Sequence, residues 1–466
     1  METLQRAINR GNVPTGFDVT NSLKFEPDNS EYLQWTNIDA YATSARKKTF
    51  SFSVWFKITE LGAQRTIWST AANGYLLLQA DGELKWQQSY NSVVKVLQTN
   101  RVLRDTNAWY NVIVAVDTTQ STEANRQRLY INGVEETSFS TGTYPSQNDE
   151  ADNVYQSFHS LGAYNASSIF FAGYMAEVAF VSDSQITPTD VGEFDADSGI
   201  WKPKKYSGGS APSYFLQFKD SSDLGSATGL DADTLNNIGA TNQTIDTCTN
   251  NFCTFNILVD TDNKPTISEG AMKVIGQGTS NWGNAYGSMG VQRGKWYYEY
   301  KVDNTDIGGH GWSTFPDTSD DATSAQFLFD QSAVLQGSGT HYYQRINGTQ
   351  ISNESTGFGT SAVNDIFGVF LNADDQEITW AKNGSVLSGS LSQPISLNAA
   401  FSGHFIFPCN VQFENDGGQY NFGAYTLISN TRSFSDADGQ GKFVYSPVLS
   451  GVNYFALCSK NLAEYG

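Results

Sequence analysis

Charged residues are scarce in this chain, and cysteine and methionine are scarcer still. Charged residues make up 16% of the 466 positions, and cysteine and methionine occur 4 times each. Four cysteines are too few for a disulfide framework, and Cys248 and Cys253, spaced C-x4-C, have no second pair nearby. No apolar run approaches the roughly eighteen residues of a membrane helix, and Met1–Gly11 has no apolar signal-peptide core. We therefore expect free thiols formed in a reducing cytoplasm, no signal peptide and no membrane span.

Basic residues are in the minority, which restricts the partners that the chain can have. Lys and Arg number 28 against 48 Asp and Glu, a formal net charge of −20. Non-specific nucleic-acid binding depends on neutralising phosphates with Lys and Arg, so this balance excludes nucleic acid as an expected partner. The same charge keeps a concentrated or multimeric protein soluble.

Glycine and aromatic residues are abundant: 42 Gly, 29 Phe, 23 Tyr and 10 Trp. Such a composition favours strands and turns over helices. A single hydrophobic core stops growing near about 250–300 residues, so the length predicts two or three domains. The expected fold class is therefore all-β, with two large domains.

Short alternating segments bounded by Gly, Asn, Asp and Ser recur along the chain, which is typical of antiparallel sandwiches. In Thr49–Ile58 (TFSFSVWFKI), every second residue from Phe50 to Phe56 is large and apolar, which predicts one core-facing side. Asn132-Gly133 and Asn383-Gly384 predict two-residue type I′ hairpin turns. Further expected strands are Tyr75–Leu78, Leu84–Gln88, Trp109–Val116, Arg128–Ile131, Gly294–Val302, Asp365–Leu371, Glu377–Trp380 and Asn410–Phe413. Ser168–Val181 (SIFFAGYMAEVAFV) favours strands around Gly173.

An ordered set of motifs in the first half resembles the laminin-G-like, concanavalin A-like region of bacteriophage tail-fibre proteins. The motifs are Thr15–Asp18 (TGFD), Asn21–Phe25 (NSLKF), Asp28–Leu33 (DNSEYL), Phe52–Lys57 (FSVWFK), Ala108–Tyr110 (AWY), Val114–Thr119 (VAVDTT), Leu129–Val134 (LYINGV), Phe171–Phe180 and Gly199–Lys204 (GIWKPK). A lone LYINGV is a weak signal, but the ordered set over about two hundred residues is specific.

The second half looks like a SPRY domain of the type found in similar phage proteins. The landmarks are Thr249–Asn256 (TNNFCTFN), Ile267–Gly270 (ISEG), Gly294–Tyr300 (GKWYYEY), Gly311-Trp312, Asp365–Val369 (DIFGV), Ile378–Trp380 with Lys382–Gly384, and Asn421–Gly423 (NFG). The tail, with Phe443–Ser446 and Gly451–Leu462, is similar to a closing segment of those fibres. No anchoring domain or collagen-like stalk precedes Gly11, which leaves the mode of attachment to a virion open.

The resemblance implies two antiparallel β-sandwich (jelly-roll) domains. Residues 1–16 are expected to form an N-terminal arm, either a docking or oligomerisation helix or a frayed terminus. The laminin-G/concanavalin A-like sandwich is expected at 17–220, a linker or long loop at 221–248, the SPRY-like sandwich at 249–430 and the closing segment at 431–466.

Catalytic motifs are not apparent. Glycosidases of this fold carry carboxylates at alternate strand positions, but Glu193–Ser198 (EFDADS) lacks the last carboxylate and is interpreted as a solvated turn. The histidines, His159, His310, His341 and His404, do not have metal-ligand or zincin spacing and are expected to be structural or surface residues. We expect no enzymatic activity, no cofactor and no catalytic residue.

Acidic loops offer oxygen ligands that suit calcium. They are Asp260–Asn263, Asp317–Asp321, Asn372–Asp375 and Asp436–Gly439. None fits an EF-hand loop, and solvated turns are the favoured interpretation, with calcium as the alternative.

Glycan recognition combines flat aromatic faces with Asn, Asp or Gln side chains. Two groups have this composition, and their candidate binding residues are Trp282, Asn284, Tyr286, Tyr342 and Tyr343. The alternative is that these aromatics belong to the core or to a subunit interface.

The sequence as a whole predicts a tail-fibre-like or adhesin-like phage virion appendage on the particle exterior, assembled in the host cytoplasm. Loops on the rigid sandwiches would bind host surface glycans or proteins, and weak single sites would act together through multivalency. The resemblance implies a homo-oligomer, with a trimer favoured, that contacts other virion proteins. The alternatives are a purely structural virion component (capsid decoration, head fibre or fibre-assembly subunit) and a glycan depolymerase.

Overall fold

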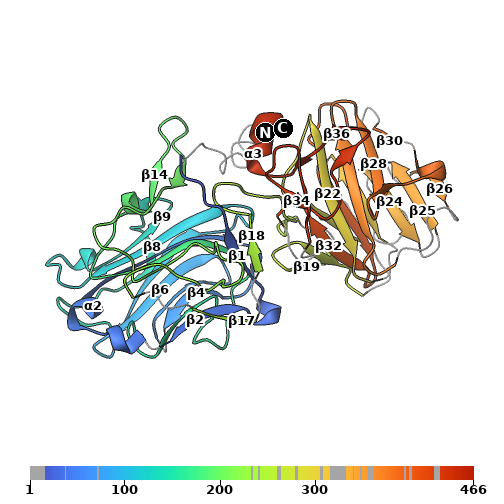
Figure 1. Ribbon diagram of the computed structural model, residues 1–466. Coiled ribbons are helices and arrows are strands. Elements are labelled where there is room, and N and C mark those ends of the chain that lie inside the picture. The colour runs from blue at the N-terminus through green and yellow to red at the C-terminus, as the bar shows by residue number, and fades with distance from the viewer. Residues whose placement is uncertain are drawn as a thin grey trace. The chain divides into compact units, whose positions relative to one another are not determined.

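The computed structural model describes residues 16–466 except for 37, 71–72, 232–234, 240–241, 260–263, 279–281, 305–307, 315–331, 339–340, 347–348, 355–361, 393–394, 398–400 and 425–430. The chain divides into two compact units between Asn250 and Asn251. The first unit is blue to green in Figure 1 and the second is yellow to red. Strand pairs are antiparallel except for the short parallel pair of β22 with β37 in the second unit, so the predicted all-β class with two sandwiches is confirmed.

The first unit consists of two sheets packed face to face. One has the order β10 (Val134–Glu135), β9 (Gln127–Ile131), β8 (Trp109–Asp117), β3 (Thr49–Ile58), β13 (Gly173–Ser182), β1 (Ser22–Phe25), β18 (Asn242–Thr244), with β16 (Tyr214–Leu216) also on β13. The other has the order β11 (Phe139–Gly142), β7 (Val93–Val102), β6 (Glu83–Tyr90), β5 (Tyr75–Leu78), β4 (Arg65–Thr70), β12 (Phe158–Leu161), β2 (Tyr32–Thr36), β17 (Asn236–Ile238). A short helix α2 (Ser44–Lys48) precedes β3, and β14 (Gly192–Phe194) pairs with β15 (Trp201–Pro203) as a separate hairpin.

Aromatic rings from both sheets fill the space between them. The alternate residues Phe50 and Phe52 of β3 point into this core, as the sequence pattern predicts. The Phe52 ring stacks on Trp68 of the facing sheet at 5.4 Å between centroids, and Trp68 stacks on Trp86 at 5.8 Å. Such pairs add about 0.5–1.5 kcal/mol each beyond the area that they bury. The core therefore rests on the period-two pattern of its strands.

The central strands of the first unit are buried on their outer face as well. Every residue of β13, and every residue of β3 after Thr49, is buried. Outer-face residues such as Trp55 and Ala179 pack under residues that follow β13 in the sequence, among them Trp201 and Phe215. We call residues 183–250 the cover segment, because they close this face.

A buried ion pair fastens the end of the cover segment to β3. Lys57 Nζ lies 2.9 Å from Asp246 Oδ2, and the two side chains are 0% and 2% exposed. Asp246 Oδ1 also accepts a hydrogen bond from Trp109 Nε1 at 3.2 Å. A charge buried in this way is tolerated because it is paired and hydrogen-bonded.

Residues 221–248, expected to form a linker or long loop, belong to the first unit. β17 pairs with β2, and β18 pairs with β1, so both sheets gain an edge strand from the 221–248 region. Both strands are three residues long and polar (NNI and NQT). Edge strands of this kind are held by backbone hydrogen bonds, which leave no alternating pattern in the sequence.

The second unit repeats the two-sheet plan. One sheet has the order β19 (Thr266–Ser268), β20 (Lys273–Ile275), β32 (Gly417–Asn421), β22 (Lys295–Val302), β27 (Ile366–Asn372), β28 (Glu377–Lys382), β29 (Ser385–Val386), with β30 (Ile395–Ser396) on β28 and β37 (Phe455–Ala456) on β22. The other has the order β21 (Trp282–Tyr286), β31 (Phe407–Phe413), β23 (Gly309–Ser313), β24 (Ser332–Ser338), β25 (His341–Ile346), β26 (Thr349–Glu354). Trp296, Tyr298, Trp312 and Trp380 lie in the core between them.

Both predicted type I′ turns are present. Asn132 and Gly133 have φ of 48° and 78° between β9 and β10, and Asn383 and Gly384 have φ of 50° and 80° between β28 and β29. Positive φ at both central residues is the signature of this turn, which is why Asn-Gly is its strongest sequence signal.

The C-terminal segment is integrated into the second unit. It contains the hairpins β33 (Phe434–Ser435) with β34 (Lys442–Phe443) and β35 (Val448–Leu449) with β36 (Val452–Asn453), and the helix α3 (Ser459–Tyr465). The fully buried Glu299 of β22 accepts hydrogen bonds from the backbone N–H groups of Val444 and Tyr445. Burial raises the pKa of Glu299 to about 6, although these donors and Asn421 favour its ionised form.

Neither helix in the described part of the chain has the length and apolar character that crossing a membrane requires. The sequence indicated a helix only within Met1–Gly11, which lies outside the described residues. The helix α3 went unpredicted because its seven residues are too few to show helical periodicity.

Asp246→Ala is expected to destabilise the first unit by about 3–5 kcal/mol, because Lys57 would remain buried without its counter-charge. Guanidinium unfolding followed by tryptophan fluorescence measures this change. The matched control is Glu135→Ala, which removes a half-exposed partner of Arg128 and should cost less than about 1 kcal/mol. Equal effects of the two substitutions would contradict a fastening role for Asp246.

Candidate functional site

The five sequence-predicted binding residues all lie in one sheet of the second unit but are not brought together. Trp282, Asn284 and Tyr286 are on the edge strand β21, whereas Tyr342 and Tyr343 are on β25, with three strands between. Residues that pair directly on successive strands form a row across the sheet, in the order Asn284, Val411, Gly309, Gln336, Tyr343. Tyr343 therefore shares the outer face with Asn284, and its neighbour Tyr342 points to the core.

Two of these five residues are interior side chains. Tyr286 is 1% exposed within an outer-face cluster, and Tyr342 is 2% exposed and packs on Phe367 at 5.6 Å. Neither presents its ring to solvent. This burial agrees with the alternative that the sequence left open, in which these aromatics belong to the core. Trp282 is half-buried, and its ring lies 4.8 Å from Phe413. A binding role for Trp282, Asn284 and Tyr343 stays a prediction.

The acidic stretch Glu193–Ser198 begins in β14 and continues into the turn of the β14–β15 hairpin. Asp195 accepts hydrogen bonds from the backbone N–H and the hydroxyl of Ser198, and these bonds lower its pKa to about 2. Lys202 lies 3.2 Å from Asp195 and 3.5 Å from Glu193. These carboxylates are thus satisfied locally, as the solvated-turn interpretation predicts.

The acidic loops considered for calcium are used internally where the structure describes them. Asp436 accepts hydrogen bonds from the N–H groups of Gly441 and Ala456 and from the Asn461 amide. Asp374 pairs with Lys295 at 3.2 Å. Asp260–Asn263 and Asp317–Asp321 lie outside the described residues. Within the described residues, no group of three or more His, Cys, Asp or Glu side chains is placed to hold a metal ion.

His159, His310 and the four cysteines are buried, structural residues. His159 is fully buried against Trp68, and burial lowers its pKa to about 3, so it is neutral. Burial lowers the pKa of His310 similarly, to about 3. His404 is exposed, and the side chain of His341 is outside the described set. All four cysteines are buried free thiols, as the composition predicts.

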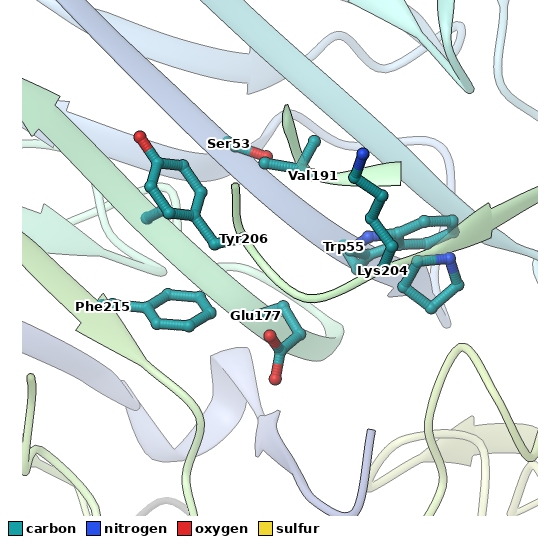
Figure 2. Close-up of a pocket in the computed structure, with 9 residues that line it drawn as sticks. Ser53, Trp55, Glu177, Val191, Lys204, Tyr206 and Phe215 are labelled. Carbon is teal, nitrogen blue, oxygen red and sulfur yellow. The ribbon is translucent and has the colours of Figure 1, made fainter. Parts of the chain in front are cut away.

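A hollow opens on the outer face of the first unit, where the cover segment meets β3 and β13. It is shallow: its empty space is about 270 Å³ when open solvent is counted, and its enclosed part has room for about one water molecule. Its lining is Ser53, Trp55, Glu177, Ala179, Val191, Pro203, Lys204, Tyr206 and Phe215. In Figure 2, Tyr206 and Phe215 lie to one side, Trp55 and Lys204 lie to the other, and Glu177 lies between them. We call this the Glu177 hollow.

Glu177 reaches the hollow because β13 bulges at this point. The pairing of β13 with β3 shifts register between Ala176 and Ala179, and Glu177 has a left-handed φ of 47°. A bulge re-aims a side chain, and a non-glycine residue with this φ is uncommon outside functional or strained sites. Gln217 Nε2 donates to both carboxyl oxygens, at 3.0 and 3.3 Å.

Burial raises the pKa of Glu177 to about 7, although the Gln217 amide and the charge of Lys219 act in the opposite direction. The carboxyl is therefore close to half-ionised at neutral pH. Perturbed pKa values of this kind gather at functional sites, although structural networks also produce them. Sequence reasoning missed Glu177, yet a signal existed: it is the one acid within the apolar stretch Ser168–Val181.

One family model matches part of the first unit. Residues 27–192 match the family model described as the Concanavalin A-like lectin/glucanases superfamily. No curated relative matches the sequence.

Solved structures give similarities of low identity. The TRIM65 PSpry domain is 15% identical, with 36% of this chain and 88% of that chain covered and a TM-score of 0.29. Domains LG4-5 of the mouse laminin alpha1 chain are 10% identical, with 96% of each chain covered and a TM-score of 0.29. A native heptameric SAP-like pentraxin from Limulus polyphemus is 13% identical, with 37% and 80% covered and a TM-score of 0.26. At these TM-scores, function has to be argued from the chain's own residues.

The raised pKa of Glu177 predicts a pH-dependent stability difference between the wild type and Glu177→Gln. The folded protein binds the proton of the Glu177 carboxyl more tightly than the unfolded chain does. The stability that this proton contributes is therefore complete below about pH 4.5 and is lost as pH rises through about 7. The substitution removes that loss. Between about pH 5 and pH 8, the unfolding free energy of Glu177→Gln should rise relative to that of the wild type by on the order of 2–3 kcal/mol. A difference that stays constant with pH, measured by denaturant unfolding, would contradict the assignment.

Proposed function

We propose that the chain is a binding protein without catalytic activity that recognises glycans on a cell surface. The observation that carries the proposal is the Glu177 hollow, which combines aromatic rings with a single carboxylic acid on a sandwich whose sequence matches a lectin/glucanase family model. Ligand sites are typically concave and mostly apolar, with a few polar groups that fix orientation.

The acid content of the hollow supports binding over hydrolysis. Glycosidases flank the scissile bond with two carboxyl groups, about 5–5.5 Å apart in retaining enzymes and about 6.5–9.5 Å apart in inverting ones. Glu177 is the one carboxylic acid among the nine lining residues. The carboxylates of the β14–β15 turn are held by Ser198 and Lys202, so they are engaged elsewhere.

The finer assignment is a phage virion appendage of the tail-fibre or adhesin kind. Its support is the resemblance of the ordered sequence motifs to such proteins. In this role, several copies, most simply a trimer, stand on the particle exterior and contact other virion proteins. Individual glycan contacts are weak, and multivalency makes them avid. The net charge of −20 suits a protein displayed at high local density.

A glycan array probed with the full chain tests the proposal. We expect binding to a subset of bacterial surface glycans and no release of reducing ends from those glycans on prolonged incubation. Release of reducing ends would favour a depolymerase. A blank array together with stable binding to purified virion proteins would favour a purely structural component. Either outcome contradicts the proposal.

Trp282 offers a test of the second unit. Trp282→Ala is expected to weaken apparent affinity on the array by about tenfold, because the accessible part of a Trp ring contributes strongly to recognition and the two units act together. Phe434→Ala is the matched control, since Phe434 is a 42% exposed aromatic of the same unit. If both variants bind like the wild type, Trp282 has no part in recognition.

A further inference from the structure

Two aromatic rings form one wall of the Glu177 hollow. The Tyr206 and Phe215 rings lie 6.4 Å apart between centroids and are inclined at 45°. Both residues are half-buried, so each supports the cover segment and keeps part of its ring accessible. The Tyr206 hydroxyl donates to the Ser210 carbonyl at 2.7 Å, which fixes the position of its ring. The wall therefore offers preset apolar faces to a flat ligand.

Both hydrogen-bond donors and acceptors face the same space. The two carboxyl oxygens of Glu177 receive hydrogen bonds from a single amide nitrogen, that of Gln217, and an ionised carboxylate has about four acceptor positions. The Trp55 indole N–H finds no acceptor among the described residues, and the Ser53 hydroxyl also lines the hollow. A hydroxyl group can donate to the acid and accept from the indole.

The charges around Glu177 disfavour an ionic ligand. Lys219 donates to Gln217 Oε1 at 3.0 Å, and its charge acts on Glu177. Lys204 lines the opposite wall, with its amine pointing away from the carboxyl in Figure 2. Cys248, a further titratable neighbour, is a neutral thiol, because burial and then the charge of Glu177 raise its pKa, and burial raises the pKa of Tyr206 to about 12. Two cations repel a cationic ligand, and the Glu177 carboxylate repels an anionic group that is placed directly against it.

We propose that the Glu177 hollow binds one pyranose ring of a neutral glycan, with an apolar face on Phe215 and Tyr206 and hydroxyls on Glu177 and Trp55. This assignment rests on the proposed glycan-binding function and names the site and the chemical class of its occupant. The enclosed part of the hollow has room for about one water-sized group, so the ring rests over its open side and only a hydroxyl group reaches inward. The β-bulge at Glu177, where φ is positive, directs the carboxyl toward this ring.

Saturation-transfer NMR on the full chain tests the site directly. The probes are the methyl glycosides of glucose, galactose, mannose and N-acetylglucosamine. At least one should receive saturation on its ring protons. Phe215→Ala and Glu177→Gln should each weaken its binding by about tenfold or more, because each removes a contact to the ring or a hydrogen bond to a charged group.

Matched controls come from the neighbouring hairpin. Phe194 is a 51% exposed aromatic, and Glu193 is an acid whose side chain is 48% exposed; neither lines the hollow. Phe194→Ala and Glu193→Gln should bind within about twofold of the wild type. The affinity of the wild type should fall as pH is lowered from about 8 to about 6, because the protonated acid loses acceptor capacity, and Glu177→Gln should lose this dependence.

The outcomes separate this inference from the function on which it rests. Binding of a glycoside that is indifferent to both test variants overturns the site and leaves the proposed function standing. An array positive for oligosaccharides with no glycoside bound also overturns the site. A blank array overturns both the site and the function. The unfolding curves of Glu177→Gln show independently whether that variant folds.

Discussion

The outer face of the β3–β13 pair has to be covered, and much of the first unit follows from that requirement. β13 is apolar on both faces, and the outer face of β3, with Ser51, Ser53, Trp55 and Lys57, is buried as well, so a single facing sheet does not account for the burial of these strands. The cover segment solves this problem with loops and short edge strands instead of a third sheet. Lys57 and Asp246 secure one end of it, and the Trp201 indole, which donates to Asn111 on β8 at 3.1 Å, secures its hairpin.

The Glu177 hollow is a product of the same requirement. Loops cover a flat sheet less completely than another sheet does, and the gap lies where the β13 bulge turns a carboxyl outward. The acid is close enough to the interior to lose much of its solvation, yet it opens to a space with aromatic walls. This placement on the outer side of one sheet, away from the aromatic core between the two sheets, lets the first unit keep an intact core and carry a polar site.

The sequence was sufficient for those parts of the fold that depend on local pattern. The alternation in Thr49–Ile58 predicted the bounds of β3 and its core-facing side, and Asn-Gly pairs predicted two hairpins. The sequence was insufficient where the position of a strand depends on pairing with residues far away in the chain. β17 and β18 have no alternation of their own, and their places depend on the exposed edges of β2 and β1.

The candidate site was harder to predict for a related reason. Aromatic and amide composition around Trp282 and Tyr342 resembles a glycan surface, but composition does not reveal which face of a strand is covered, and Tyr286 and Tyr342 proved to be interior. Glu177 was visible as an acid in an apolar strand. The site around Glu177 depends on Gln217, Tyr206 and Phe215, which lie some 30 to 40 positions further along the chain. The fold of the cover segment brings them next to Glu177.

A site-specific titration of Glu177 tests the central claim most directly, because a carboxyl placed beneath the cover segment has to be desolvated. Carbon-13 NMR of the side-chain carboxyls in the folded full chain, with Glu177→Gln to assign the signal, would give its midpoint. The account predicts half-titration near pH 7. A midpoint near the ordinary glutamate value of about 4.3 would mean that the acid is open to water, and it would contradict the covered face and the hollow together.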